Sequence, residues 1–136
     1  MPAMDITLPT PLLAGLSPQT FMRRHWQKKP LLIRQAVPNV QPPVTRSELF
    51  ALAARDDVDS RLIVQAEHGW AMRHGPLTRR QLPPLSRARW TLLVKGLDLH
   101  VAAAHALLSK FRFVPDARLD DLMISYASEA LLLKAI

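Results

Sequence analysis

Leu119-Asp120-Asp121-Leu122-Met123-Ile124-Ser125-Tyr126-Ala127-Ser128 is the clearest strand-forming stretch of this 136-residue sequence. Successive side chains of a β-strand point to opposite faces of the sheet. The alternation separates two sets of residues: Leu122, Ile124 and Tyr126 on one side, and Met123, Ser125 and Ala127 on the other. The sequence therefore predicts a strand over residues 119–126. The tail from Glu129 to Ile136 follows it and has a helix-favouring composition.

Ser125 is the polar residue on the side with the smaller side chains. A buried hydroxyl almost always has a hydrogen-bond partner. Two interpretations follow from this: Ser125 is a buried serine bonded to a neighbouring strand, or it points into a polar pocket.

Two helices are marked by their boundary residues. Ser17 is a good N-cap and Pro18 suits the first helical position, so a helix is predicted to start there and to end before Pro30. A strongly apolar helix is predicted from Val101 to Phe111, and Pro115 ends that region.

A capping box marks a third helix. Thr45 is followed three residues later by Glu48, which predicts a helix from Arg46 to about Arg55. A single helical turn is expected within residues 77–85, before two consecutive prolines.

Short β-rich segments alternate with these helices. They are Leu31–Ile33, Ser60–Ala66, Trp70–Arg73 and Trp90–Val94. The second and third are separated by Glu67-His68-Gly69, the spacing of a short hairpin loop. The pattern predicts an α+β fold.

The composition is that of a soluble globular protein, with 49% hydrophobic and 21% charged residues. No apolar run approaches the ~20 residues of a membrane-spanning helix, and the start has no secretory signal pattern. The chain has no cysteine, which excludes disulfides, thiolate catalysis and cysteine-based metal sites. We expect a cytoplasmic protein without membrane contact.

The net charge of +7 makes attraction to RNA or a ribonucleoprotein a possible property. The basic residues come in short groups, and no single segment forms a dense stripe with interleaved aromatics. We interpret the charge mainly as solvated surface, so direct nucleic-acid binding is a secondary hypothesis.

The chain offers little evidence of its own catalytic chemistry. The five histidines include no His-x-Asp or His-x-Glu pair, and His100 and His105 do not share a helix face. The tryptophans at positions 26, 70 and 90 are expected to pack in the core.

Several blocks, in the same order, resemble the bacterial Jumonji-C family of cupin-fold ribosomal-protein arginyl hydroxylases, which depend on Fe(II) and 2-oxoglutarate. The blocks are Phe21–Pro30, Val58–Leu62, Arg73–Pro76, Trp90–Val94 and Asp120–Ser125. The resemblance implies the N-terminal lead-in of a double-stranded β-helix whose barrel is incomplete. It divides the chain into an extended leader (1–16), an α+β region of the Jumonji-C domain (17–118), a first barrel strand (119–128) and a divergent tail (129–136).

The family continues from the equivalent strand into a Gly-rich turn and a His-x-Asp pair that begins the metal site. Residues 129–136 do not match that pattern, so the resemblance assigns no catalytic residue and no metal ligand to this sequence. It places Ser125 in the 2-oxoglutarate pocket and Met123 in the substrate site. It also implies that Asp120 and Asp121 position the strand that follows rather than catalyse. We expect a truncated chain, as a frameshift or an early stop would produce, that binds neither iron nor 2-oxoglutarate alone.

The leading hypothesis is a fragment of a dioxygenase that in complete form hydroxylates an arginine of a ribosomal protein. Its uncovered barrel edge is expected to favour self-association. The alternatives are a small basic module that binds RNA or the ribosome without catalysis, and one chain of a two-chain enzyme.

Overall fold

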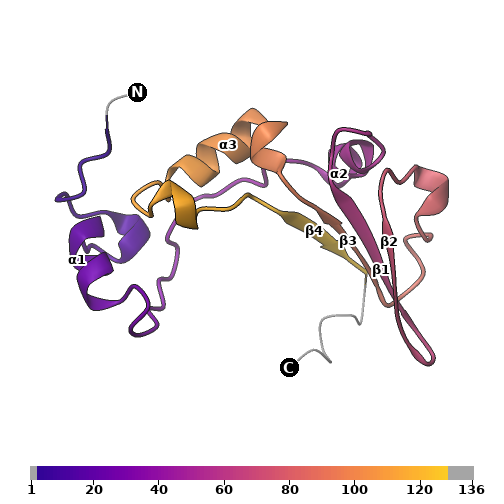
Figure 1. The fold of residues 1–136 in the computed structure, drawn as a ribbon, viewed down its shortest axis with the longest axis horizontal. Helices are drawn as coiled ribbons and strands as arrows, with labels where there is room; N and C mark the ends of the chain where they lie inside the picture. The colour runs from indigo at the N-terminus through magenta and orange to yellow at the C-terminus, as the bar shows by residue number, and fades with distance from the viewer. Residues whose placement is uncertain (1–2, 129–136) are drawn as a thin grey trace. The chain divides into compact units, whose positions relative to one another are not determined.

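The computed structural model describes residues 3–128 (Figure 1). The chain forms two compact units. Unit 1 consists of Met1–Pro42 and Lys110–Leu119, and unit 2 consists of Pro43–Ser109 and Asp120–Ile136. The chain therefore leaves unit 1, builds most of unit 2, returns to unit 1 and then completes the sheet of unit 2. The predicted tail, 129–136, lies outside the described residues.

Unit 1 contains short helical elements: η1 (Pro11–Leu13), α1 (Pro18–Arg24) and η4 (Asp116–Arg118). α1 starts as predicted, because Ser17 Oγ accepts a hydrogen bond from Thr20 N at 3.1 Å. Phe21 of α1 meets Phe113 edge to face, with ring centroids 5.9 Å apart. This contact joins the two chain segments of the unit.

The prediction of a strand over Leu31–Ile33 is wrong. These residues have no regular structure, and Leu32 is 77% exposed. A short apolar run becomes a strand only where a partner strand is available, and no described strand pairs with it. Within the predicted leader, residues 10–16 form a closed turn in which Thr10 N donates to Leu16 O at 3.1 Å.

Unit 2 is organised around a four-stranded antiparallel sheet. Its strands are β1 (Ser60–Ala66), β2 (Gly69–His74), β3 (Trp90–Val94) and β4 (Ile124–Ala127), in the spatial order β2-β1-β3-β4. β1 and β2 form the predicted hairpin, with Ala66 opposite Gly69. Gly69 has φ +138, a backbone angle that side-chain-bearing residues rarely adopt.

The helices of unit 2 are α2 (Arg46–Ala53) and α3 (Ala102–Ser109), with 3-10 turns η2 (Arg79–Gln81) and η3 (Leu97–Leu99). The capping box of α2 is confirmed: Glu48 N donates to Thr45 Oγ1 at 3.2 Å, and Thr45 N donates to Glu48 Oε2 at 3.0 Å. α2 ends at Ala53, two residues earlier than predicted.

The core of unit 2 lies between α2 and one face of the sheet. Leu49 and Leu52 of α2 belong to the same buried cluster as Leu62 of β1 and Leu92 of β3. Trp90 is 0% exposed and confirms the expected core role. The expected core role is wrong for Trp70, because this tryptophan is 59% exposed on the edge strand β2.

The strand predicted over residues 119–126 is shorter in the structure. β4 covers Ile124–Ala127, because its partner β3 ends at Val94, which lies opposite Ile124. The predicted alternation holds: Leu122, Ile124 and Tyr126 pack against the core cluster. Unit 2 thus combines helices with an antiparallel sheet that is not closed within the described residues. Among residues 3–128, no helix is long and apolar enough to cross a membrane.

Candidate functional site on the open face of the sheet

The sheet face opposite α2 carries both residues singled out from the sequence. Directly paired residues of neighbouring antiparallel strands point to the same side. The row His74, Arg61, Leu93, Ser125 crosses all four strands on this side, and the next row is Met72, Ile63, Thr91, Ala127. We call this side of the sheet, together with Trp70 and Met123, the open face.

Met123 and Ser125 are both exposed on the open face, and Met123 is 48% exposed. The Ser125 hydroxyl makes no hydrogen bond to another described residue. The interpretation of Ser125 as a buried serine bonded to a neighbouring strand is therefore wrong. Among the described residues, the Ser125 side chain is exposed on this side of the sheet.

Ser128 is the buried serine that the sequence did not reveal. It is 4% exposed, its Oγ accepts a hydrogen bond from Trp90 N at 2.9 Å, and it donates to Trp90 O at 3.1 Å. Ser128 N also donates to Trp90 O at 3.0 Å. These bonds fix the end of β4 against the start of β3. The sequence alone gives no sign of this role, because it depends on which residue of β3 lies opposite the end of β4.

Two carboxylates fix the other end of β4. Asp121 Oδ2 accepts a hydrogen bond from Gly96 N at 2.5 Å, and Asp98 Oδ1 accepts one from Leu122 N at 3.0 Å. Leu97 N donates to Leu122 O at 3.0 Å between them. We call this arrangement the carboxylate clasp. It gives Asp121 the positioning role expected from the sequence, and it holds the strand that carries Met123 and Ser125.

Arg61 supplies positive charge to the open face. Its guanidinium lies 3.8 Å from Asp59 Oδ2, a partly exposed pair of the kind that contributes little to stability. Its buried Nε has no hydrogen-bond partner among the described residues. With Ser125 on the same row, the face offers donors to an anion.

The histidines are dispersed through the described structure. His25 stacks on Phe21 with ring centroids 5.9 Å apart, and His100 Nδ1 lies 4.0 Å from Asp57 Oδ2. Asp57 also accepts hydrogen bonds from Arg55 Nε and Nη2 at 2.9 and 2.6 Å, which lower the pKa of its carboxyl. Across residues 3–128, no three His, Asp or Glu side chains gather in a way that would hold a metal ion. The described residues therefore do not fit an iron centre.

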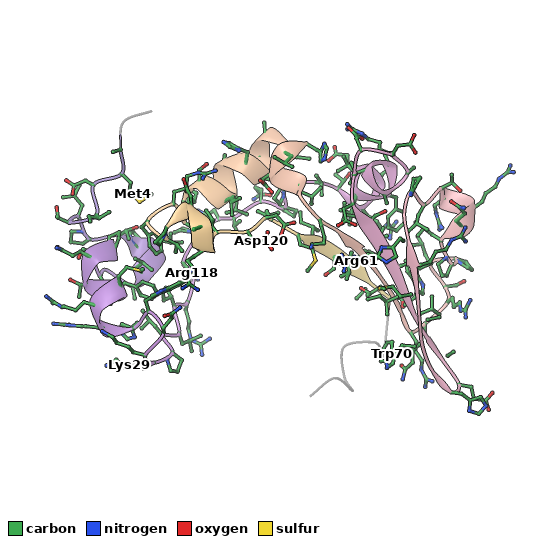
Figure 2. All side chains as sticks on the ribbon, in the orientation of Figure 1. Met4, Lys29, Arg61, Trp70, Arg118 and Asp120 are labelled. Carbon is green, nitrogen blue, oxygen red and sulfur yellow. The ribbon has the colours of Figure 1, made fainter. Side chains whose placement is uncertain are left out.

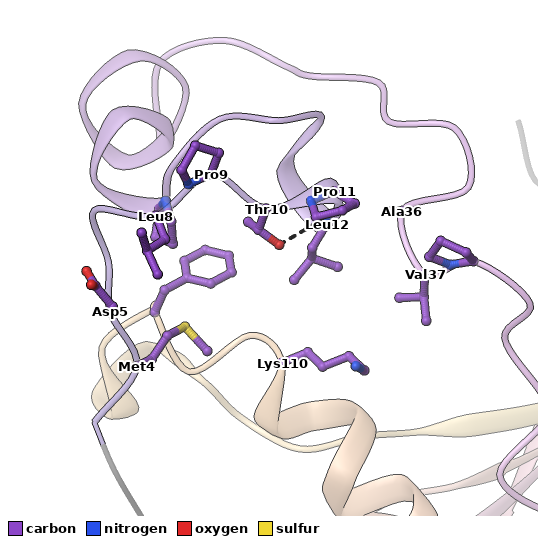
Figure 3. Close-up of a pocket in the computed structure, with 13 residues that line it drawn as sticks. Met4, Asp5, Leu8, Pro9, Thr10, Pro11, Leu12, Ala36, Val37 and Lys110 are labelled. Atoms are coloured by element: carbon purple, nitrogen blue, oxygen red, sulfur yellow. Dashed lines mark hydrogen bonds between the residues drawn. The ribbon is translucent and has the colours of Figure 1, made fainter.

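A separate pocket of about 350 Å³ lies within unit 1 (Figure 3). Its lining is mainly apolar and includes Met4, Leu8, Val37 and Phe113. Thr10 Oγ1, in its wall, accepts a hydrogen bond from Leu12 N at 3.3 Å, so this hydroxyl is occupied within the turn. The pocket holds neither of the residues predicted from the sequence.

Comparisons with known proteins point to one class of enzyme. No family model matches the sequence. The chain is 37% identical over 107 residues to the ribosomal protein uL16 3-hydroxylase of Escherichia coli, covering 79% of this chain and 28% of that protein. It is 32% identical over 126 residues to the probable ribosomal oxygenase of Haemophilus influenzae, covering 92% of this chain and 30% of that one.

Solved structures agree with the sequence comparison. A structure of YcfD, a ribosomal oxygenase from Escherichia coli, in complex with cobalt and 2-oxoglutarate matches with a TM-score of 0.72 and 35% identity. The match covers 83% of this chain and 31% of that one. The chain thus spans about 30% of the length of the curated relatives it matches. Sequence and fold together identify the chain as homologous to a segment of the bacterial ribosomal oxygenases.

Proposed function

We propose that this chain serves as the N-terminal lead-in of a cupin-fold, Jumonji-C-type oxygenase that hydroxylates an arginine of a ribosomal protein with Fe(II) and 2-oxoglutarate. The observation that carries the proposal is the joint sequence and fold match to a ribosomal oxygenase whose structure contains cobalt and 2-oxoglutarate. The metal ligands of the whole enzyme would come from outside the described residues, because these residues form no cluster suited to a metal.

We propose that the open face of this chain forms one wall of the 2-oxoglutarate and substrate site of the whole enzyme. The open face supports it, because that face presents a free hydroxyl at Ser125 and a cation at Arg61 on one cross-strand row. Neighbouring strands lie about 4.8 Å apart, so the two backbones are roughly 10 Å apart across the row. A 2-oxoglutarate carboxylate would bind near Ser125, and the ribosomal protein would contact Met123.

A chimera tests this function. Residues 3–128 would replace the matching segment of the Escherichia coli uL16 3-hydroxylase, and succinate release and uL16 hydroxylation would be measured. We expect the folded chimera to hydroxylate uL16. A folded chimera that binds 2-oxoglutarate but leaves uL16 unmodified would overturn the proposal.

Two substitutions in the chimera separate the roles on the open face. Ser125→Leu should raise the KM for 2-oxoglutarate, and Met123→Lys should raise the KM for uL16 while leaving that for 2-oxoglutarate unchanged. Ser86→Leu is the control, because Ser86 is exposed in unit 2 between β2 and β3 and lies off the open face. Equal effects of S86L and S125L on the KM for 2-oxoglutarate would show that Ser125 does not line the 2-oxoglutarate pocket.

A further inference from the structure

The positive charge of the chain is concentrated in one of its two units. Unit 1 holds eight lysines and arginines against two acidic residues, a net charge of +6 out of the chain's +7. Unit 2 has 84 residues against 52 in unit 1, but it holds ten basic and nine acidic residues and so is nearly neutral. The charge is therefore a property of unit 1 and not of the chain as a whole.

Five of the eight basic residues of unit 1 lie within residues 23–34, which we call the basic stretch. They are Arg23, Arg24, Lys28, Lys29 and Arg34, all exposed, and no acidic residue interrupts them. Figure 2 shows Lys29 and Arg118 on this unit. Such a run produces a strong positive potential that polyanions sense over about a Debye length.

The acidic residues of unit 1 do not neutralise the basic stretch. Asp5 accepts hydrogen bonds from Thr7 N and Oγ1 at 2.9 and 2.6 Å, and Asp116 pairs with Arg112 at 3.3 Å. Among the residues that the structure describes, none of the five side chains of the basic stretch forms a salt bridge.

Only three of the five basic residues have a structural role within unit 1. Arg23 and Arg24 lie in the last turn of α1, where the helix dipole favours cations, and Lys28 Nζ donates to Arg23 O. No such contact within the described residues involves the side chains of Lys29 or Arg34. Their charge is available to a partner.

The basic stretch is better suited to bind RNA than a membrane surface. A helix that lies on a membrane needs a broad free apolar face. α1 has only seven residues, and its Phe21 is already packed against His25 and Phe113. Trp26, half-buried, lies in the sequence between the two basic pairs, and a tryptophan among cations can stack on a base.

We propose that unit 1 binds the phosphate backbone of RNA through the basic stretch. This inference does not depend on the proposed oxygenase function, because the chimera assay reports turnover and the assay below reports only association.

Fluorescence anisotropy with a labelled 20-nucleotide single-stranded RNA, titrated with the full chain over a range of salt concentrations, tests the proposal. The test variant is Arg24→Gln/Lys29→Gln/Arg34→Gln. The control is Arg73→Gln/Arg80→Gln/Arg87→Gln, which removes three exposed charges from unit 2 and gives the same net charge. Circular dichroism verifies that both variants fold.

We expect the test variant to bind about tenfold more weakly at moderate salt and its log–log salt slope to be shallower by about 2, since each single-strand phosphate contact contributes roughly 0.7. The control should change affinity less than about threefold. Equal losses in the two variants, or no binding by the wild type at low salt, would overturn the proposal. Binding to phosphatidylglycerol vesicles without binding to RNA would also overturn it and would assign the surface to membranes.

Discussion

The Ser128 hydroxyl bonds the chain just after β4 to the first residue of β3. Replacing Ser128 with alanine would leave Trp90 N without its acceptor in a fully buried position. An unpaired buried amide costs about 1–3 kcal/mol. We expect Ser128→Ala to lower the free energy of unfolding by that amount, as measured by urea denaturation.

Ser125→Ala is the matched control, three residues before Ser128 and within β4. Its hydroxyl is exposed and makes no hydrogen bond within residues 3–128, so the substitution should change stability by less than about 0.5 kcal/mol. If the two variants lost equal stability, the hydrogen bonds assigned to Ser128 would be absent in solution.

The stability contributed by the Asp57 carboxylate depends on pH, mainly because of its hydrogen bonds from Arg55. The hydrogen bonds from Arg55 hold the pKa of the Asp57 carboxyl below its ordinary value of 3.8. A carboxyl whose folded pKa is lowered contributes stability above its unfolded pKa and loses it as the pH falls through the folded pKa. This contribution is therefore lost only in the acid range below about pH 4.

We expect Arg55→Gln to move the pKa of Asp57 back toward 3.8, as followed by carboxyl carbon chemical shifts during an acid titration. Arg80→Gln is the control, because Arg80 has no ion pair among the described residues. A pKa of Asp57 that does not respond to Arg55→Gln would contradict the bidentate pair.

At the scale of the element, β4 depends on the carboxylate clasp at its start. Asp121→Ala would leave Gly96 N without its acceptor, and hydrogen bonds to charged groups contribute about 1.5–3 kcal/mol. We expect a loss in that range by thermal or urea unfolding, and a smaller loss in Asp121→Asn, whose amide oxygen can still accept. Asp120→Ala should have almost no effect, because Asp120 is exposed and makes no bond to another described residue.

Sequence reasoning located elements whose cause is local. The capping box at Thr45, the N-cap at Ser17 and the hairpin loop before Gly69 each depend on residues within a few positions of one another. The misses have non-local causes. Leu31–Ile33 lacks a partner strand, and the length of β4 is set by the end of β3, about 30 residues away in sequence.

In the candidate site, too, features with local causes could be predicted from the sequence and features with non-local causes could not. Alternation within one strand was enough to place Met123 and Ser125 together on the side away from the core. Alternation could not show that Arg61 lies on the same cross-strand row as Ser125, or that Ser128 bonds to Trp90. Both facts depend on the register between strands.

At the scale of the whole molecule, both edges of the sheet lack a partner strand among the described residues. β2 is exposed along its full length and carries Trp70 and Met72 on the open face. Exposed edges that carry large apolar side chains promote association. We expect the chain to self-associate with rising concentration in sedimentation velocity.

Trp70→Lys should weaken this association, because a charge on an edge strand opposes pairing with another chain. Leu99→Lys is a control, since Leu99 is also exposed but lies in η3 and not in a strand of the sheet. A wild-type chain that remains monomeric at all concentrations would refute the prediction.

Unit 1 is assembled from residues that lie on both sides of most of unit 2 in the sequence, and Phe21 meets Phe113 across that gap. During synthesis, α1 leaves the ribosome long before the segment that completes its packing. Contacts so distant in sequence form late and slow folding. The basic stretch would therefore emerge on an unfinished scaffold beside ribosomal RNA, and the order of translation itself would expose it to nucleic acid before the sheet is complete.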